Sequence, residues 1–350
     1  MKKSRIQGLS IAMLVAGGLC GPAPAFAADK AVAYVSNQNG GVTVIDLQTM
    51  TASGALDVGA KGPRGIGITA DGKWLVTANK DGKNIAIVDT TSATKPRLVA
   101  IGKNPEFVRV KGDRAYVTYE PGSDGGPPKA GAAPDDDDKI PGHIAIVDLK
   151  QGKVIGDIIG KPETEGLEFS RDGKLMLITN ESDNSITVFD LAANKQRAVI
   201  PVGKYGQRPR GIKMSPDGKI YVTTLEFSNK MLVLNEKFEV VKEVATGQFP
   251  YGVSFDRSGK RIFVAANKDK LLQVFDATTF EKIKDIPTGE RCWHFSFTPD
   301  DQQILLACGK SGEIVVVDAN KLEVTKRIPD QDLPWGIVTY PRAMGSLDTP

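Results

Sequence analysis

One position that recurs in seven repeats of the chain carries side chains suited to molecular recognition. Two of these residues are arginines, whose planar guanidinium groups can bind a carboxylate through two parallel hydrogen bonds. Three are aromatic, and their rings could stack on a planar ligand. The position follows a proline or its counterpart, and its occupants, which His294 adjoins, are Arg64, Glu106, Glu165, Arg210, Tyr251, Trp293 and Trp335. The set predicts a ligand-binding surface for an anionic planar molecule, such as a quinone cofactor or a haem.

The same charges also permit a purely structural interpretation. Arg64 with Glu106 and Arg210 with Glu165 are two pairs of opposite charge that could pair across the mouth of a central channel and carry structure alone. His294 could act as an axial ligand or as a base, although a single histidine is more often a hydrogen-bonded structural residue. The residue types alone therefore permit both a ligand-binding site and a purely structural role for these charges.

Other chemistry finds little support in the sequence. After the predicted leader, the chain contains two histidines, His143 and His294, which are too few for a multi-histidine metal site. It has neither a Cys-x-x-Cys-His motif for covalent haem attachment nor a Gly-x-Ser-x-Gly nucleophile motif. Glu106 and Glu165 are the apparent acid–base candidates. We therefore favour a binding protein, with no catalytic residue and no metal site, over an enzyme.

These positions belong to a strand–turn–strand phrase that recurs along most of the chain. In its clearest copy, residues 209–212 (PRGI) precede the turn 215–219 (SPDGK) and the strand 221–223 (YVT). The Asp-Gly pair suits a tight hairpin, because glycine takes the positive φ that the turn demands. A further apolar run closes each phrase at Asp46, Asp89, Asp148, Asp190, Asn235, Asp276 and Asp318. Most of these intervals are near 42 residues, which predicts an all-β, seven-bladed β-propeller with four strands per blade.

The two ends of the repeat indicate how the ring closes. The first phrase starts at residues 33–37, in the second strand of its blade, with no Pro-x-Gly strand before it. Such a strand occurs at the other end, in residues 334–340, with no hairpin after it. We therefore expect the C-terminal strand to complete the first blade and remove an exposed sheet edge. Residues 28–342 would then form the propeller, and residues 343–350 a C-terminal tail.

One interval between closing residues, of 59 residues, is clearly longer than the rest. The surplus lies at about residues 120–142 and is rich in glycine, proline and aspartate, with four consecutive aspartates at 135–138. Because this composition cannot form a core, we expect a flexible, solvated insert in the third blade. A hard-cation site is the alternative, but four consecutive aspartates lack the alternating spacing of a calcium loop.

The first 27 residues have the features of a secretory signal peptide. A basic start (Lys2, Lys3 and Arg5) precedes a short apolar segment, and residues 25–27 (AFA) supply a small-x-small cleavage pattern. We expect a mature chain that begins at Ala28 in the periplasm. Without the leader, 42 of the 45 Lys and Arg residues remain against 42 Asp and Glu. This balance argues against nucleic acid as a partner, and no later segment is apolar enough for membrane insertion. We expect a monomer.

Two cysteines remain in the mature chain, Cys292 and Cys308, and they flank the hairpin of the last blade. The oxidising periplasm permits a disulfide between them. A register shift of one residue would aim the two side chains apart. A bridge and two buried free thiols both stay open.

The YVTN-type strand ends, the Pro-x-Gly openings and the SPDGK turns resemble the bacterial YVTN-repeat propellers, over residues 32–340. The Trp-bearing stretches 292–300 (CWHFSFTPD) and 334–338 (PWGIV) are similar to the last repeats of the periplasmic propellers associated with pyrroloquinoline quinone (PQQ)-dependent alcohol oxidation. This resemblance implies a non-catalytic interaction module beside a quinoprotein dehydrogenase or a cytochrome c. In a propeller the first strand of each blade lines a central channel, so the recurring site position would face a funnel at its mouth. The alternatives are a protein that binds haem or PQQ at this central funnel, and a propeller enzyme of the lactonase kind.

Overall fold

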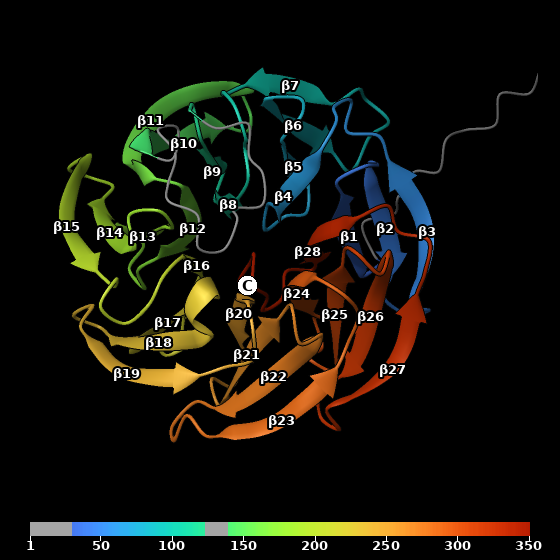
Figure 1. Cartoon of the computed structure of the whole chain (residues 1–350). Coiled ribbons are helices and arrows are strands. Elements are labelled where there is room, and N and C mark those ends of the chain that lie inside the picture. The colour runs from blue at the N-terminus through green and yellow to red at the C-terminus, as the bar shows by residue number, and fades with distance from the viewer. Residues whose placement is uncertain (1–29, 123–138) are drawn as a thin grey trace, which may run out of the picture.

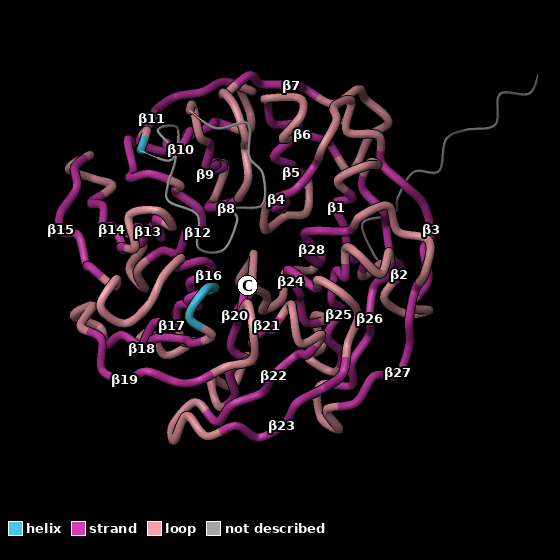
Figure 2. The backbone as a smooth tube through the Cα atoms, in the orientation of Figure 1, coloured by secondary structure: helices cyan, strands magenta, loops and turns pink. Residues whose placement is uncertain are grey.

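The computed structural model describes residues 30–122 and 139–350, which form a ring of seven blades around a central axis (Figure 1). Each blade is a four-stranded antiparallel sheet, with one strand nearest the axis and the fourth strand at the rim. The predicted all-β, seven-bladed propeller is therefore confirmed. Figure 2 shows how little helix accompanies the strands, and η2 (Glu226–Ser228) is one such short turn.

Strands follow one another in chain order within every blade except the first, which takes its inner strand from the C-terminus. From the axis outwards, the first three blades consist of β28 (Pro334–Tyr340), β1 (Val32–Asn37), β2 (Val42–Asp46) and β3 (Thr51–Leu56); β4 (Pro63–Ile68), β5 (Trp74–Asn79), β6 (Asn84–Asp89) and β7 (Arg97–Ala100); and β8 (Val108–Lys111), β9 (Arg114–Tyr119), β10 (Pro141–Asp148) and β11 (Lys153–Pro162).

The other four blades have the same order from axis to rim. They consist of β12 (Thr164–Phe169), β13 (Leu175–Asn180), β14 (Ser185–Asp190) and β15 (Lys195–Pro201); β16 (Pro209–Met214), β17 (Ile220–Leu225), β18 (Lys230–Asn235) and β19 (Val240–Ala245); β20 (Pro250–Phe255), β21 (Arg261–Ala266), β22 (Leu271–Asp276) and β23 (Lys282–Pro287); and β24 (Cys292–Phe297), β25 (Gln303–Cys308), β26 (Glu313–Asp318) and β27 (Glu323–Ile328).

The SPDGK turn is built by its own side chains. Ser215 Oγ donates to Asp217 Oδ1 at 2.6 Å, and the backbone N–H of Lys219 donates to the same oxygen at 3.1 Å. Gly218 supplies the positive φ, 75°, that the turn needs. The turn therefore fixes the register between the inner strand and the second strand of the blade.

The ring closes as the sequence predicts. β28 pairs antiparallel with β1, with Tyr34 opposite Val338 and Val35 opposite Ile337. All four of these residues are buried. The C-terminal strand therefore completes the first blade and covers the edge that β1 would otherwise expose.

Neighbouring inner strands approach so closely that glycine follows the site position in five blades. A Cβ on Gly65 would lie 2.3 Å from the carbonyl oxygen of Glu106, and one on Gly166 would lie 2.4 Å from that of Arg210. Gly211, Gly252 and Gly336 hold the equivalent places. Larger residues occupy this place in two blades, the third and the seventh, and they are Phe107 and His294.

The residues after β28 fold back into the centre of the ring, where the C-terminus lies in Figure 1. Met344 and Leu347 are buried. The N–H of Phe297 donates to the carbonyl oxygen of Met344 at 2.8 Å, and the N–H of Ser346 donates to that of Phe295 at 2.9 Å. Residues 344–346 therefore pack along β24.

Cys292 and Cys308 lie directly opposite each other on β24 and β25 and form a disulfide. The predicted signal peptide (1–27) and the central part of the predicted insert (123–138) lie outside the described residues. Within the described residues, no helix has the length and apolar character needed to cross a bilayer.

Candidate functional site

The inner strands all start at one end of the axis, which we call the mouth. Each strand enters through a residue with left-handed backbone, such as Glu163 (φ 50°) or Arg208 (φ 60°). The predicted site residue comes two positions later. Because this geometry repeats around the ring, it gathers the predicted residues at the mouth: Arg64, Glu106, Glu165, Arg210, Tyr251, Trp293 and Trp335, with His294 beside them.

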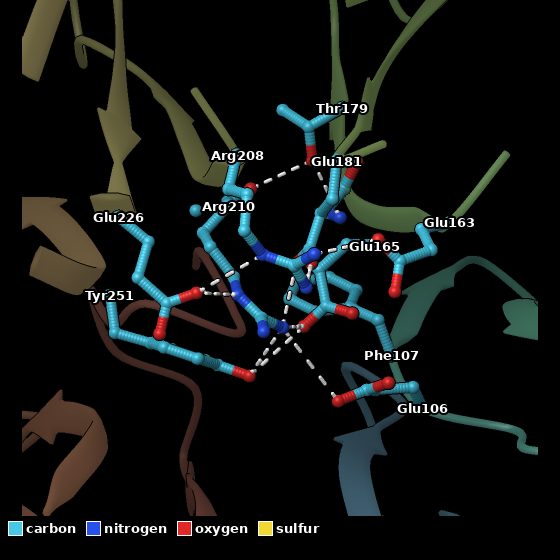
Figure 3. A network of polar contacts seen from close by, with 12 residues as sticks. Glu106, Phe107, Glu163, Glu165, Thr179, Glu181, Arg208, Arg210, Glu226 and Tyr251 are labelled. Atoms are coloured by element: carbon cyan, nitrogen blue, oxygen red, sulfur yellow. Dashed lines mark hydrogen bonds and ion pairs between the residues drawn. The ribbon is translucent and has the colours of Figure 1, made fainter. Parts of the chain in front are cut away.

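Arg210 is the centre of the polar half of the mouth (Figure 3). Its Nε donates to Glu226 at 2.8 Å, and its Nη1 lies 3.0 Å from Glu165 and 2.6 Å from Glu181. The same Nη1 donates to the hydroxyl of Tyr251 at 3.0 Å, and this hydroxyl donates to Glu165 at 3.1 Å. The Arg210 side chain is 9% exposed, so these charges interact in a medium of low effective dielectric.

Arg208 and Arg64 extend the network on either side. Arg208 Nη1 lies 2.7 Å from Glu163, and its Nη2 donates to Glu181. Arg64 Nη1 lies 2.9 Å from Glu106. The three guanidinium groups are therefore all engaged by carboxylates of the protein itself.

Both ion pairs of the structural interpretation are present, Arg64 with Glu106 and Arg210 with Glu165. Each pair spans two neighbouring inner strands, β4 with the residues before β8, and β16 with β12. An anionic ligand at either arginine would have to compete with a carboxylate that already lies at hydrogen-bonding distance.

The repeat pattern did not predict four further glutamates of the mouth, because they occupy other positions of the repeat. Glu163 precedes an inner strand, whereas Glu120, Glu181 and Glu226 directly follow the second strand of their blades. Backbone hydrogen bonds hold these loops beside the inner strand, from Glu181 N to Glu163 O at 2.8 Å and from Glu226 N to Arg208 O at 2.9 Å. Alignment of the repeats beyond the end of the second strand could have found this position.

Carboxylates outnumber guanidinium groups in this network. Burial and repulsion by Glu106 raise the pKa of Glu165 to about 8, and the same two causes raise the pKa of Glu120 to about 8. Burial also raises the pKa of Glu181 well above its usual value. The network therefore retains protons at neutral pH, and its members are Glu106, Glu120, Glu163, Glu165, Glu181 and Glu226 with Arg64, Arg208 and Arg210.

Aromatic rings form the other half of the mouth. The ring centroid of His294 lies 4.3 Å from that of Trp335 and 5.4 Å from that of Tyr251. Trp293 belongs to the same buried cluster. The Arg210 guanidinium lies over the Tyr251 ring, 4.5 Å from its centroid, so Tyr251 joins the aromatic half to the polar half.

His294 is a neutral imidazole with one nitrogen in use. Burial and the charge of Arg210 lower its pKa to about 3. Its Nδ1 lies 3.0 Å from Ser346 Oγ, and that hydroxyl also accepts the N–H of Phe295 and lies 3.1 Å from its carbonyl oxygen. Every donor is satisfied when the hydroxyl donates to the carbonyl oxygen and Nδ1–H donates to the hydroxyl. Nε2 is then a bare acceptor, and it has no partner within the described residues.

The far end of the axis, where the inner strands finish, is occupied by the C-terminal tail. Arg109 donates to the carbonyl oxygen of Leu347 at 2.6 Å and pairs with Glu168 at 2.6 Å. Lys213 donates to the carbonyl oxygen of Asp348 at 2.9 Å and lies 3.2 Å from Glu168. These five residues, which we call the far-end cluster, are buried and bind one another.

No family model and no curated protein matches this chain. Several solved structures share its fold. The periplasmic gluconolactonase PpgL of Pseudomonas aeruginosa is 14% identical, with a TM-score of 0.71 over 91% of this chain and 100% of that one. Hydrazine synthase of Kuenenia stuttgartiensis is 16% identical, with a TM-score of 0.69 over 81% and 91%. The dihydro-heme d1 dehydrogenase NirN in complex with DHE is 16% identical, with a TM-score of 0.64 over 87% and 74%. At these identities the likeness establishes the propeller fold and no function.

Proposed function

We propose that this chain is a monomeric periplasmic binding propeller, without catalysis of its own, that accompanies a quinoprotein dehydrogenase or a cytochrome c. The signal-peptide features of residues 1–27 support the location. The Trp-bearing stretches 292–300 and 334–338 support the association with PQQ-dependent alcohol oxidation.

The observation that carries the binding role is the contrast between the two ends of the axis. The far end is taken up by the chain's own tail, whereas the mouth collects charged and aromatic side chains from different blades. Arg64 and Glu163 at the mouth keep 15% of their side-chain surface exposed, so the network reaches solvent. Its excess of carboxylates suits a partner that presents lysine or arginine side chains.

Affinity capture from periplasmic extract tests this proposal. The immobilised mature protein is expected to retain a quinoprotein dehydrogenase or a cytochrome c, identified by mass spectrometry. Glu163→Lys should abolish capture, because it reverses a charge at the exposed rim of the mouth. Glu243→Gln, on the outer strand β19, is the matched control and should capture normally. Capture of neither protein class would count against the proposal.

A second candidate is a protein that binds haem or PQQ at the mouth, and the unpartnered Nε2 of His294 favours it. This nitrogen could ligate a haem iron, whereas Arg64 and Arg210, which would hold acidic groups, are already paired with carboxylates. The mouth therefore fits the iron of a haem better than the acid groups of either cofactor. Titration of the protein and of His294→Ala with haem, followed by absorption, tests this candidate. An identical spectrum for both would remove it.

A third candidate is lactone hydrolysis, which one feature favours. The pKa of Glu165, raised to about 8 by burial and by Glu106, suits a general acid or base near neutral pH. A pH-stat assay with gluconolactone tests it. Equal rates for the unaltered protein and for Glu165→Gln would exclude this residue as the catalytic group.

A further inference from the structure

Carboxylates of the third and fourth blades interact with one another at the seam between these two blades. Glu120, 9% exposed, follows β9, and its Oε2 accepts a hydrogen bond from Asn104 Nδ2 at 2.8 Å. Burial and the charges of Glu106, Glu163 and Glu165 raise its pKa to about 8. The charged groups that act on Glu120 most strongly are thus other carboxylates, and its hydrogen-bond donor is a neutral amide.

The cations of the network are already shared among several acceptors. Arg208 forms ion pairs with Glu163 and Glu181. Arg210 forms ion pairs with Glu165, Glu181 and Glu226. Neither of these guanidinium groups supplies a full charge to the seam, where Arg64 pairs with Glu106 and Lys80 also helps to lower the pKa of Glu106. The fourth blade therefore brings glutamates to this seam whose charge the protein only partly neutralises.

A second observation indicates what is missing. Asn104 is 3% exposed and its Oδ1 has no hydrogen-bond partner among the described residues, although its Nδ2 is bound to Glu120. A buried acceptor without a donor costs about 1–3 kcal/mol. His294 Nε2 and Asn267 Oδ1 are bare acceptors at the same end of the axis, and Arg208 Nε is a donor there without a hydrogen bond, although it lies 3.6 Å from Glu226. Those of these bare groups that have no ion-pair partner are acceptors, so the group that would satisfy them is a donor of hydrogen bonds.

The backbone at this seam differs from that of its neighbours. Gly65 and Gly166 allow the inner strands to approach closely at the seams on either side. Phe107 takes the place of that glycine between the third and fourth blades, so a side chain is present there in place of the open backbone. The seam that collects the carboxylates is thus one of the two that lack the tight glycine contact.

A metal ion does not fit these acceptors. Over the described parts of the chain, no three His, Cys, Asp or Glu side chains are placed to hold one. An N–H donor bonds at about 2.7–3.2 Å and reaches several oxygens from one charged group. We propose that the seam binds an organic cation, an alkylammonium or guanidinium group, through Glu120, Glu106, Glu163, Glu165 and Asn104 Oδ1. This inference rests on the proposed function in taking the mouth as the binding surface.

Calorimetry with the full mature chain tests the ligand class. n-Butylguanidinium stays charged throughout the neutral range, and pentanoate is its anionic counterpart of similar size. The structure predicts saturable binding of the cation at least tenfold tighter than of the anion. Equal affinity for the two, or binding of pentanoate alone, would overturn the proposal.

Proton release gives an independent readout. Glu120 and Glu165 hold protons at pH 7, because their pKa values lie near 8. A bound cation should displace these protons, so the affinity should rise from pH 6 to pH 9 and the binding enthalpy should depend on the buffer. Binding without proton release would place the cation elsewhere and overturn the assignment. The other charged groups at the seam are Glu106, Glu163, Arg64, Arg208, Arg210 and Lys80.

Substitutions locate the site. Glu120→Gln should weaken n-butylguanidinium binding at least tenfold and leave the fold intact, because it removes an acid that its neighbours repel. Glu243→Gln on β19 is the control and should bind normally. Unchanged affinity in Glu120→Gln would overturn the proposal, as would a loss of affinity that is matched in the control.

The source of the cation is distinguished by two peptides. A capped Gly-Arg-Gly peptide represents a side chain of a docked protein, and the same peptide with citrulline lacks the charge. Binding of n-butylguanidinium alone would indicate a small-molecule ligand, and tighter binding of the arginine peptide would indicate a protein partner; both support the cation class. If periplasmic capture fails while the cation binds, only the assigned partner is wrong. If capture succeeds while neither cation binds, only this inference is wrong.

Discussion

The two ends of the propeller axis are built by the same inner strands, yet their buried charges are paired differently. At the far end, Arg109 and Lys213 share Glu168 and donate to carbonyl oxygens of the tail. At the mouth, six glutamates meet three arginines, and three carboxyl groups hold raised pKa values. The far end has its partners within the chain, whereas the mouth has more carboxylates than guanidinium groups and a buried acceptor, Asn104 Oδ1, without a partner among the described residues. Stability explains the first arrangement, and the second is what the proposed binding role predicts.

The contrast also shows why burial alone does not identify a site. The charged side chains of both regions are largely buried, and both regions contain short ion pairs. A buried ion pair often offsets little more than its own desolvation. What separates the regions is the partner: the far-end cluster binds a segment of the chain itself, while Asn104 Oδ1 at the mouth has no partner among the described residues.

Truncation of the C-terminus should have the largest effect on stability, and it removes the tail that occupies the far end. Deleting residues 334–350 removes β28, exposes the edge of β1 and should abolish cooperative folding, because the ring can no longer close. Deleting residues 343–350 keeps β28 and removes only the tail, so that Arg109 and Lys213 lose their carbonyl acceptors. The shorter deletion should stay folded with a melting temperature several degrees lower. Thermal melts followed by circular dichroism measure both. Full-length stability would contradict the ring closure in the longer deletion and the far-end role in the shorter one.

Removing Arg210 should have the next largest effect. Arg210→Ala leaves Glu165, Glu181 and Glu226 without their shared cation, and breaking a buried charge network by one partner costs about 3–5 kcal/mol. Arg64 has one ion pair and greater exposure, so Arg64→Ala should cost roughly 1–3 kcal/mol. Denaturant unfolding measures both. Arg210→Ala with unchanged stability would show that the arginine is held for a ligand and not for the scaffold.

The pH dependence of stability should separate the two ends by sign. Glu120 and Glu165 have folded pKa values near 8, so the folded state holds protons that the unfolded chain has lost. The contribution of these protonated carboxyl groups to the free energy of unfolding is complete below the unfolded pKa of about 4.5, and it is lost as pH rises through 8. Lys213 does the reverse: burial and Arg109 lower its pKa to about 7, so stability rises between pH 7 and about 10.5.

Melting temperatures across pH 5–10 measure both trends, which should amount to a few degrees. Glu165→Gln should reduce the fall in melting temperature that occurs as pH rises to 8, and Lys213→Met should reduce the rise in melting temperature above pH 7. A melting temperature that rises steadily from pH 5 to pH 8 in the unaltered protein would contradict the protonated state of the mouth.

The repeat made the propeller and its closure predictable, because turn chemistry and strand pattern are local and recur in every blade. Position within the repeat also predicted Arg64, Glu165 and Arg210 at the mouth. It did not predict the four further glutamates. Alignment of the repeats would locate the position after the second strand, but that position carries other residue types in the remaining blades, such as Lys80 and Gly309, so its charge does not follow from the repeat. Nor did it predict the packing of residues 343–350 on the axis: their contacts with Arg109 and Lys213 join residues more than a hundred positions apart.

Ser346 links the two regions, and its removal should have the smallest effect. Its hydroxyl joins the tail to β24 and accepts the Nδ1 proton of His294. Ser346→Ala should cost about 1 kcal/mol, the usual net value of a hydrogen bond. It should also free the imidazole to exchange tautomers, because Nδ1–H loses its acceptor. Nitrogen chemical shifts of the His294 ring measure this directly: the unaltered protein should show one protonated Nδ1 and one bare Nε2, and the variant a mixture. Identical ring shifts in both proteins would mean that the tail does not set the tautomer, and that the bare acceptor at the mouth is a property of the blades alone.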